Sequence, residues 1–225
     1  MTRRCCNSTG GWMRVAHLDM TDTNQHCPSG FRLITSPKRI CGTPGSRCVS
    51  TTFPLNGVKY SRVCGKIIGY QYATVDAFHP YYLDRSRTID NYYVDGISLT
   101  HGQRPRKHIW TFAAAVDETR SNQYVCPCTK TNTPFTGVVP PFIGQDYFCE
   151  TGSTYQVRNQ FYHADPLWDG SGCGSTSSCC GFNNPPWFCK QLPQPTTDDI
   201  EMRACTNEGI ISEYLALEAV EIYVQ

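Results

Sequence analysis

Apolar and polar residues alternate over several short stretches of this chain, which is the pattern of half-buried β-strands. At 200–205 and 220–225 apolar residues occupy every second position. We expect these two segments, joined around Gly209, to form an antiparallel pair that closes the core. Further strands are expected at 12–18, 58–72, 92–100 and 108–116, the last two joined by the polar turn HGQRPRK.

The strand pattern predicts an all-β or predominantly β fold, with a sandwich-like core and long disulfide-stapled loops. Segment 58–72 is rich in β-branched and aromatic residues, and Gly65 and Gly69 mark expected bulges or bends. We divide the chain into a linker segment at 1–10 and a single disulfide-rich β domain at 11–225. Residues 126–195 lack strong periodicity, and we expect them to form an ordered, loop-rich excursion.

Composition indicates a folded protein without a general affinity for polyanions. Charged residues make up 17% of the chain, below the roughly 25% of an average soluble domain. The net charge of +1 gives no reason to expect nucleic acid or an acidic membrane as a partner. We expect no membrane span, because no apolar run approaches roughly 20 residues. The chain starts without an apolar secretion signal, and we expect an export signal to lie outside it.

The cysteines change this picture most, because there are 14 of them in 225 residues. We expect disulfides, which place the protein outside the cell, either secreted or on the cell surface. Zinc is the alternative, but structural zinc sites usually combine two C-x₂₋₄-C hooks, or one hook with a histidine pair, and neither occurs here. The cysteines are Cys5, Cys6, Cys27, Cys41, Cys48, Cys64, Cys126, Cys128, Cys149, Cys173, Cys179, Cys180, Cys189 and Cys205.

Some of these cysteines lie where their role can be considered separately. Cys41 and Cys48 end the turn-rich loop CGTPGSRC and could join directly. Cys5 and Cys6 precede the first predicted strand, and we expect them to pair within the domain. The alternative is that one of them cross-links neighbouring chains into a homo-oligomer. The sequon that begins at Asn7 predicts glycosylation, which fits export.

Several longer strings occur together over nearly the whole chain, among them GGWMRVAHLDMTD, YSRVCGKIIGYQY, YVDGISLTHG, DPLWDG and PPWFCKQLPQPTTDDIEMRAC. Through them the chain resembles a family of cysteine-rich extracellular modules of sponge and cnidarian proteins. The resemblance implies a secreted or cell-surface ectodomain and supplies no mechanism. The Gly-Gly-Trp opening and the Cys-Pro turn that follows it also resemble the first strand of fibrinogen-like and intelectin lectin heads.

The sequence contains no recognisable catalytic motif. None of its six histidines lies in a nucleophile motif such as G-x-S-x-G, and cysteines joined in disulfides are not nucleophiles. We therefore expect no catalytic residues and no enzymatic activity. The alternative is a catalytic triad that is assembled only by the fold.

Acidic residues in the loop-rich stretch are candidate calcium ligands. Asp165 and Asp169 lie four residues apart in DPLWDG, and Asp146 lies earlier in the same stretch. Calcium is held by several hard oxygens from carboxylates and backbone carbonyls, often within such loops. The alternative is that these aspartates stabilise turns through their own backbone hydrogen bonds. We expect no required cofactor, with calcium as the one candidate.

Trp168 and Trp187 are candidate sugar-binding residues, together with Asp169. Both rings lie in Gly/Pro-rich loops, where an exposed ring could stack on the face of a sugar. The alternative is that both rings are buried in a small loop core beside the disulfides.

A second candidate ligand site is basic. Arg104, Arg106 and Lys107 lie close together before a predicted strand. Arginine side chains suit sulfate, phosphate or carboxylate groups, which makes a sulfated glycan a conceivable partner. The alternative is a solvated hairpin tip.

These features favour a non-enzymatic extracellular recognition or adhesion module with lectin-like binding of glycan or matrix protein. Disulfides would hold the binding loops of 126–189 in place, so that binding orders little additional chain. The alternative function is a structural component of the extracellular matrix, or an oligomerising terminal head of a fibrous protein. Cys5 and Cys6 and the lack of a catalytic motif support that alternative.

The pairing of the cysteines gives the first testable prediction. Native protein that is unfolded in denaturant without reductant should show few groups that react with a thiol reagent, because disulfide sulfurs do not react as thiols. The same titration after reduction supplies the control and should approach 14 groups. Many reactive groups before reduction would contradict the extracellular interpretation.

Overall fold

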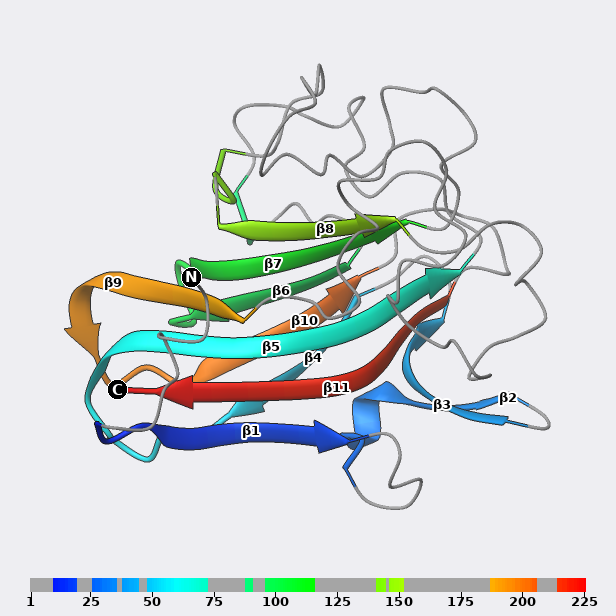
Figure 1. The fold of residues 1–225 in the computed structure, drawn as a ribbon, viewed down its shortest axis with the longest axis horizontal. Helices are drawn as coiled ribbons and strands as arrows, with labels where there is room; N and C mark the ends of the chain where they lie inside the picture. The colour runs from blue at the N-terminus through cyan, green and yellow to red at the C-terminus, as the bar shows by residue number, and fades with distance from the viewer. Residues whose placement is uncertain are drawn as a thin grey trace.

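The computed structural model describes residues 10–19, 26–35, 38–44, 48–72, 88–90, 96–115, 141–144, 146–151, 187–205 and 214–225. These residues form eleven strands and one 3₁₀ turn, η2 (Ser29–Phe31), and the strands make two sheets (Figure 1). The predicted all-β fold is confirmed. In the described part of the chain, no helix is long and apolar enough to cross a membrane.

The larger sheet has six strands, which are β1 (Met13–Asp19), β2 (Arg32–Thr35), β3 (Lys38–Pro44), β5 (Tyr60–Tyr72), β9 (Phe188–Thr196) and β11 (Tyr214–Val224). β11 is the central strand. One of its edges pairs with β5, and the other pairs first with β3 and then with β1 (Figure 1). β9 lies beyond β5 at one edge of the sheet, and all pairings are antiparallel.

The smaller sheet has five strands, which are β4 (Cys48–Phe53), β6 (Gly96–His101), β7 (Lys107–Ala115), β8 (Tyr147–Thr151) and β10 (Ile200–Cys205). Their order is β4-β10-β6-β7-β8. The β7–β8 pair is parallel and the others are antiparallel. The predicted β6–β7 hairpin is therefore confirmed, although residues 92–95 of its first predicted strand lie outside the described residues.

Apolar residues from both sheets form one core. Leu99 of β6, Met202 of β10 and Val220 of β11 are fully buried members of the same cluster. Each of these strands has one face toward this cluster, so every second residue is apolar. The alternation seen in the sequence thus reports correctly which side chains are buried.

Phe188 of β9 and Trp110 of β7 connect the two sheets. Their ring centroids lie 4.5 Å apart with the rings inclined by 16°, a stacked arrangement that adds to the energy of burial. Phe188 also lies directly opposite Gly65 of β5, in regular register. A Cβ atom on Gly65 would lie 2.7 Å from the Phe188 ring. Gly65 therefore makes room for a ring, rather than marking the bulge or bend that we expected.

The expected pairing of the two last strands is wrong. β10 lies in the smaller sheet between β4 and β6, whereas β11 lies at the centre of the larger sheet. Alternation predicts that a strand has one buried face, but both sheets of a sandwich supply such a face to the same core. The stretch 126–195 also contributes two strands, β8 and most of β9.

Disulfides cross-link the described residues. Cys27 is joined to Cys41, and Cys48 is joined to Cys205, which lies directly opposite it on the neighbouring strand β10. The expected direct link between Cys41 and Cys48 is therefore wrong. Cys64 and Cys189 are also disulfide-bonded, and no cysteine whose side chain is described is a free thiol.

The disulfide between Cys48 and Cys205 spans 157 residues. In the chain-entropy account, closing a loop of this length lowers the entropy of the unfolded chain and raises its free energy by about 5 kcal/mol at most. The disulfide therefore opposes unfolding of the smaller sheet in addition to the backbone pairing of β4 with β10.

We predict that Gly65→Ala destabilises the protein by roughly 1–3 kcal/mol, because the added methyl group would be forced against the backbone oxygen of Glu221 and against the Phe188 ring. Urea denaturation should show a lower midpoint with a similar slope. Gly30→Ala is the matched control, since the nearest atom to its Cβ would lie 3.9 Å away. Equal stability of the two variants would contradict the close approach of Phe188 to Gly65.

Candidate functional site

Three aromatic rings lie on the outer face of the larger sheet, where the ends of β1, β5, β9 and β11 meet. Tyr223 alternates with the buried Ile222 and Val224 and therefore points away from the core. Trp187 directly precedes β9, and its ring centroid lies 6.0 Å from that of Tyr223. Trp12 directly precedes β1, and all three side chains are partly exposed.

Polar side chains surround these rings. We define the aromatic face as Trp12, Arg14, Arg62, Trp187, Gln191, Glu221, Tyr223 and Gln225. Its members come from the first and last strands and from β5 and β9. Antiparallel pairing of β11 with β1 and β5, and of β5 with β9, brings them together (Figure 1). The aromatic face is thus a product of sheet register rather than of any one sequence motif.

Arg62 and Trp12 hold each other in place. The Arg62 guanidinium carbon lies 5.3 Å from the centre of the Trp12 ring, within the range of a cation–π contact. Nη1 of Arg62 donates a hydrogen bond of 2.8 Å to Oε1 of Gln225. The Gln225 amide nitrogen in turn donates to the backbone oxygen of Gly10. These contacts order the guanidinium and the ring before any ligand binds.

Tyr223 and Glu221 form a second polar group. The Tyr223 hydroxyl donates a hydrogen bond of 3.2 Å to Oε2 of Glu221. Burial and the negative charge of Glu221 raise the pKa of Tyr223, which keeps its hydroxyl protonated, while Arg14 acts in the opposite direction. The other carboxylate oxygen, Oε1, lies 3.8 Å from Nδ1 of His17.

Gln191 completes the aromatic face on the β9 side. It lies opposite Arg62, is exposed, and donates from its amide nitrogen to the backbone oxygen of Ser61 at 3.0 Å. Its Oε1 atom is an acceptor of the kind that binds a hydroxyl group. Rings beside fixed donors and acceptors suit a ligand with one apolar face and many hydroxyl groups, which describes a sugar.

Of the predicted ligand residues that the structure describes, Trp187 alone lies in the aromatic face. Trp168, Asp165, Asp169 and the glycosylation site at Asn7 lie outside the described residues, as do Cys5 and Cys6. The sugar-binding role of Trp168 and the calcium site at Asp165 and Asp169 therefore stay predictions.

The third predicted calcium ligand, Asp146, has a partner in the structure. Its carboxylate pairs with Nζ of Lys190. Within the described ranges, no three His, Cys, Asp or Glu side chains are grouped so that they could hold a metal ion.

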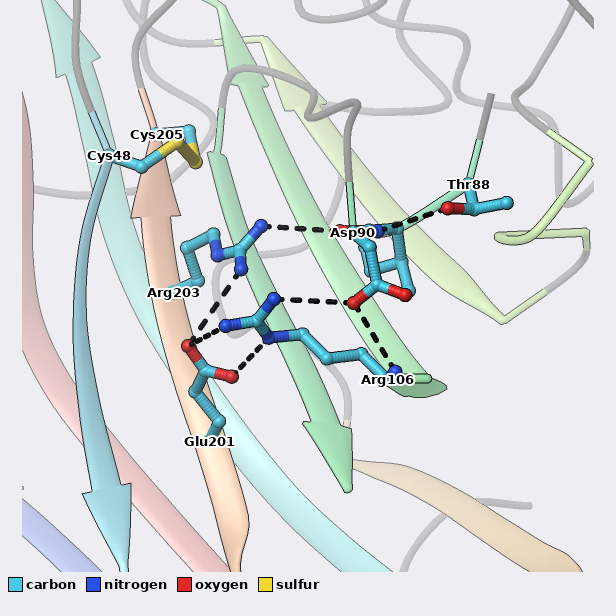
Figure 2. Close-up of polar contacts among 8 residues, drawn as sticks. Cys48, Thr88, Asp90, Arg106, Glu201, Arg203 and Cys205 are labelled. Atoms are coloured by element: carbon cyan, nitrogen blue, oxygen red, sulfur yellow. Dashed lines mark hydrogen bonds and ion pairs between the residues drawn. A yellow bond between two sulfur atoms is a disulfide. The ribbon is translucent and has the colours of Figure 1, made fainter. Parts of the chain in front are cut away.

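The predicted basic cluster is divided by the fold. Arg104 and Lys107 are exposed at the tip of the β6–β7 hairpin, whereas Arg106 turns toward β10, as Figure 2 shows. Its guanidinium pairs with Glu201 and donates to Asp90 Oδ1 at 3.2 Å. The hydrogen bond to Glu201 is the main reason that the pKa of Arg106 is raised.

Arg203 shares the same glutamate. Its Nη2 lies 3.9 Å from Oε1 of Glu201, and its Nη1 donates to the backbone oxygen of Ile89 at 3.2 Å (Figure 2). Burial is the main cause that lowers the pKa of Arg203, followed by the nearby positive charge of Arg106. The charges of two arginines and two carboxylates thus balance each other. Arg106 therefore has a structural role, which is to hold segment 88–90 against the smaller sheet.

His108 is half-buried on the outer face of the smaller sheet, in a polar group with the buried Thr111 and Ser98. A bulge in β7 places it on the same face as Thr111, three residues away. Nε2 of His108 lies 2.7 Å from the Thr111 hydroxyl, which lies 3.2 Å from that of Ser98. Burial is the main cause that lowers the pKa of His108 to about 4, so its imidazole is neutral at pH 7.

A second histidine, His101, has an acidic partner. Its Nδ1 lies 2.9 Å from Oδ2 of Asp198, and this hydrogen bond is the main cause that lowers the pKa of the Asp198 carboxyl. A catalytic triad requires a hydroxyl or thiol, a base and an orienting acid in one chain of hydrogen bonds. Among the described residues, the His108 ring is hydrogen-bonded to a hydroxyl group but not to a carboxylate. The His101 ring is hydrogen-bonded to a carboxylate but not to a hydroxyl group.

Sequence reasoning missed most of the aromatic face. The signal for Tyr223 and Gln225 was present, because both alternate with the apolar residues of the last strand and must point outward. Trp12 and Arg62 could not be found in this way, because their proximity depends on which strands pair and in which register.

No family model, curated protein or solved structure matches this chain. The resemblance to the sponge and cnidarian modules therefore stays a prediction. Function must be argued from the geometry alone.

The neutral His108 gives a prediction for the dependence of stability on pH. An unfolded histidine has a pKa of about 6.5, whereas that of folded His108 is about 4. Between these values the unfolded chain binds more protons, so the free energy of unfolding should fall as the pH is lowered from 7 to 4, by roughly 3 kcal/mol from this residue. In His108→Gln, urea denaturation should show a correspondingly smaller fall.

The imidazole signals of His108 in an NMR titration provide the direct check. Titration near pH 4 in the folded protein is expected, and titration near pH 6.5 would contradict the burial of a neutral ring.

Proposed function

We propose that this protein is a non-enzymatic extracellular recognition module that binds glycans on the aromatic face. The observation that carries the proposal is the pair of partly exposed rings, Trp187 and Tyr223, with polar side chains fixed beside them. Rings of this kind stack on the apolar face of a sugar, while donors and acceptors at their edges bind its hydroxyl groups.

The rigidity of the surroundings supports this proposal. Trp187 directly precedes Phe188, whose ring is buried against Trp110, and the next residue, Cys189, is disulfide-bonded. Tyr223 lies in a strand that pairs on both sides. A ligand would therefore meet rings that are already in place, and little conformational entropy would be lost on binding.

The disulfides support an extracellular location for this function. Disulfides persist in oxidising compartments and are rare in the cytosol. In each of the disulfides Cys27–Cys41 and Cys48–Cys205, one cysteine is buried, Cys41 in the first and Cys205 in the second. We therefore place the protein in the secreted or cell-surface space, where glycans are common ligands.

A glycan array followed by calorimetry tests the proposal. Trp187→Ala and Tyr223→Ala should each weaken binding of the best glycan about tenfold, which corresponds to roughly 1.4 kcal/mol for a lost ring contact. Tyr147→Ala is the matched control, because Tyr147 is a partly exposed ring on the smaller sheet. Unchanged thermal stability must accompany any loss of binding.

Two results would contradict the proposal. One is an array without any bound glycan. The other is a bound glycan whose affinity is the same for the parent and for Trp187→Ala. If the protein also ran as disulfide-linked oligomers on a nonreducing gel, the structural-matrix alternative through Cys5 or Cys6 would be favoured.

A further inference from the structure

We infer that the glycan bound by the aromatic face is acidic and that its carboxylate is held by Arg62. This inference rests on the proposed function and specifies the class of ligand. It starts from a difference between the arginines of the structure. Arg106 and Arg203 both lie within ion-pair distance of Glu201, whereas none of the described carboxylates lies that close to Arg62.

Arg62 is nevertheless fixed in position. The cation–π contact with Trp12 and the hydrogen bond to Gln225 hold its guanidinium group. A single nitrogen, Nη1, makes that hydrogen bond, so Nε and Nη2 remain as donors without a partner among the described residues. An arginine fork with unused donors is suited to a carboxylate, which accepts two parallel hydrogen bonds in one plane.

The charge of the surrounding surface points the same way. The side chains of the aromatic face include two arginines, Arg14 and Arg62, and one carboxylate, that of Glu221. That carboxylate already accepts from Tyr223 and lies near His17, and Lys66 lies opposite it on β5. An anionic ligand would therefore approach a surface with excess positive charge.

The position of Arg62 relative to the rings fits one extended ligand. Cys64 lies directly opposite Tyr223, and Arg62 forms the next pair on that face, with Gln225. Arg62 is thus a diagonal neighbour of Tyr223, a separation of roughly 7 Å between backbones. A sugar unit on the Trp187–Tyr223 pair could extend a carboxylate to Arg62 without a change in the sheet.

The test compares matched acidic and neutral saccharides. The probes are an oligogalacturonate and the same oligomer with its carboxyl groups reduced to alcohols, together with sialyllactose and lactose. Calorimetry should show at least one acidic member binding about tenfold more tightly than its neutral partner. Arg62→Gln should remove that difference, so that the acidic probe binds no more tightly than its neutral partner.

Two further variants separate the role of the fork from that of charge. Arg62→Lys keeps the charge but loses the planar fork, and it should bind the acidic probe as weakly as Arg62→Gln. Arg104→Gln removes an exposed positive charge at the hairpin tip, and it should bind like the parent. Loss of binding in Arg104→Gln, with full binding in Arg62→Gln, would overturn the inference and indicate that the acidic probe binds at the β6–β7 hairpin tip.

The outcomes also distinguish this inference from the proposed function. Equal binding of acidic and neutral probes, still sensitive to Trp187→Ala, would overturn the acidic ligand and leave the glycan function standing. If dextran sulfate binds more tightly than any carboxylate probe, and its binding depends on Arg62, the group that Arg62 holds is a sulfate and the inferred carboxylate is wrong. Absence of binding to every saccharide would overturn both proposals. The comparison of acidic and neutral probes on the parent protein shows, without any variant, whether one or both proposals fail.

Discussion

The contact of Phe188 with Gly65 and Trp110 is the constraint on which the rest of this structure depends. The ring lies across a glycine of its own sheet and stacks on a tryptophan of the other sheet, so that one side chain sets both the pairing of β9 and the packing of the two sheets. Because neighbouring residues of a strand point to opposite faces, the burial of Phe188 turns Trp187 outward. The position of the proposed binding ring is therefore a consequence of core packing.

The same constraint explains why the aromatic face lies on strands. Binding residues are more commonly found on loops, and we expected the loop-rich stretch to supply them. Here Tyr223, Arg62 and Gln191 belong to three neighbouring strands, and backbone hydrogen bonds fix their spacing. The ion-pair group of Arg106, Glu201, Arg203 and Asp90 plays a different part, because its charges satisfy one another and fasten a connecting segment to the smaller sheet.

The fold class and most strand positions could be predicted from the alternation of residues such as Ile200, Met202 and Ala204. The partner of each strand could not be predicted, because β10 and β11 have the same pattern and bury their apolar faces in the same core from opposite sides. Cysteine spacing misled in the same way, since Cys48 pairs with Cys205 across the sheet rather than with Cys41 nearby. Of the candidate site, Trp187 was found from its local sequence, whereas the roles of Trp12 and Arg62 depend on register and are invisible in a linear pattern.

The long span closed by Cys48 and Cys205 has a consequence for survival among proteases. A single cut in the backbone anywhere between these two residues, which are 157 positions apart, would leave the two fragments covalently attached. Trp12, which directly precedes β1, and Tyr223 of β11 lie on the outer sides of that span, and β1 and β11 pair with each other directly. A nicked molecule would thus keep part of the proposed ligand-binding surface on one connected body, which would be an advantage in an extracellular space that contains proteases.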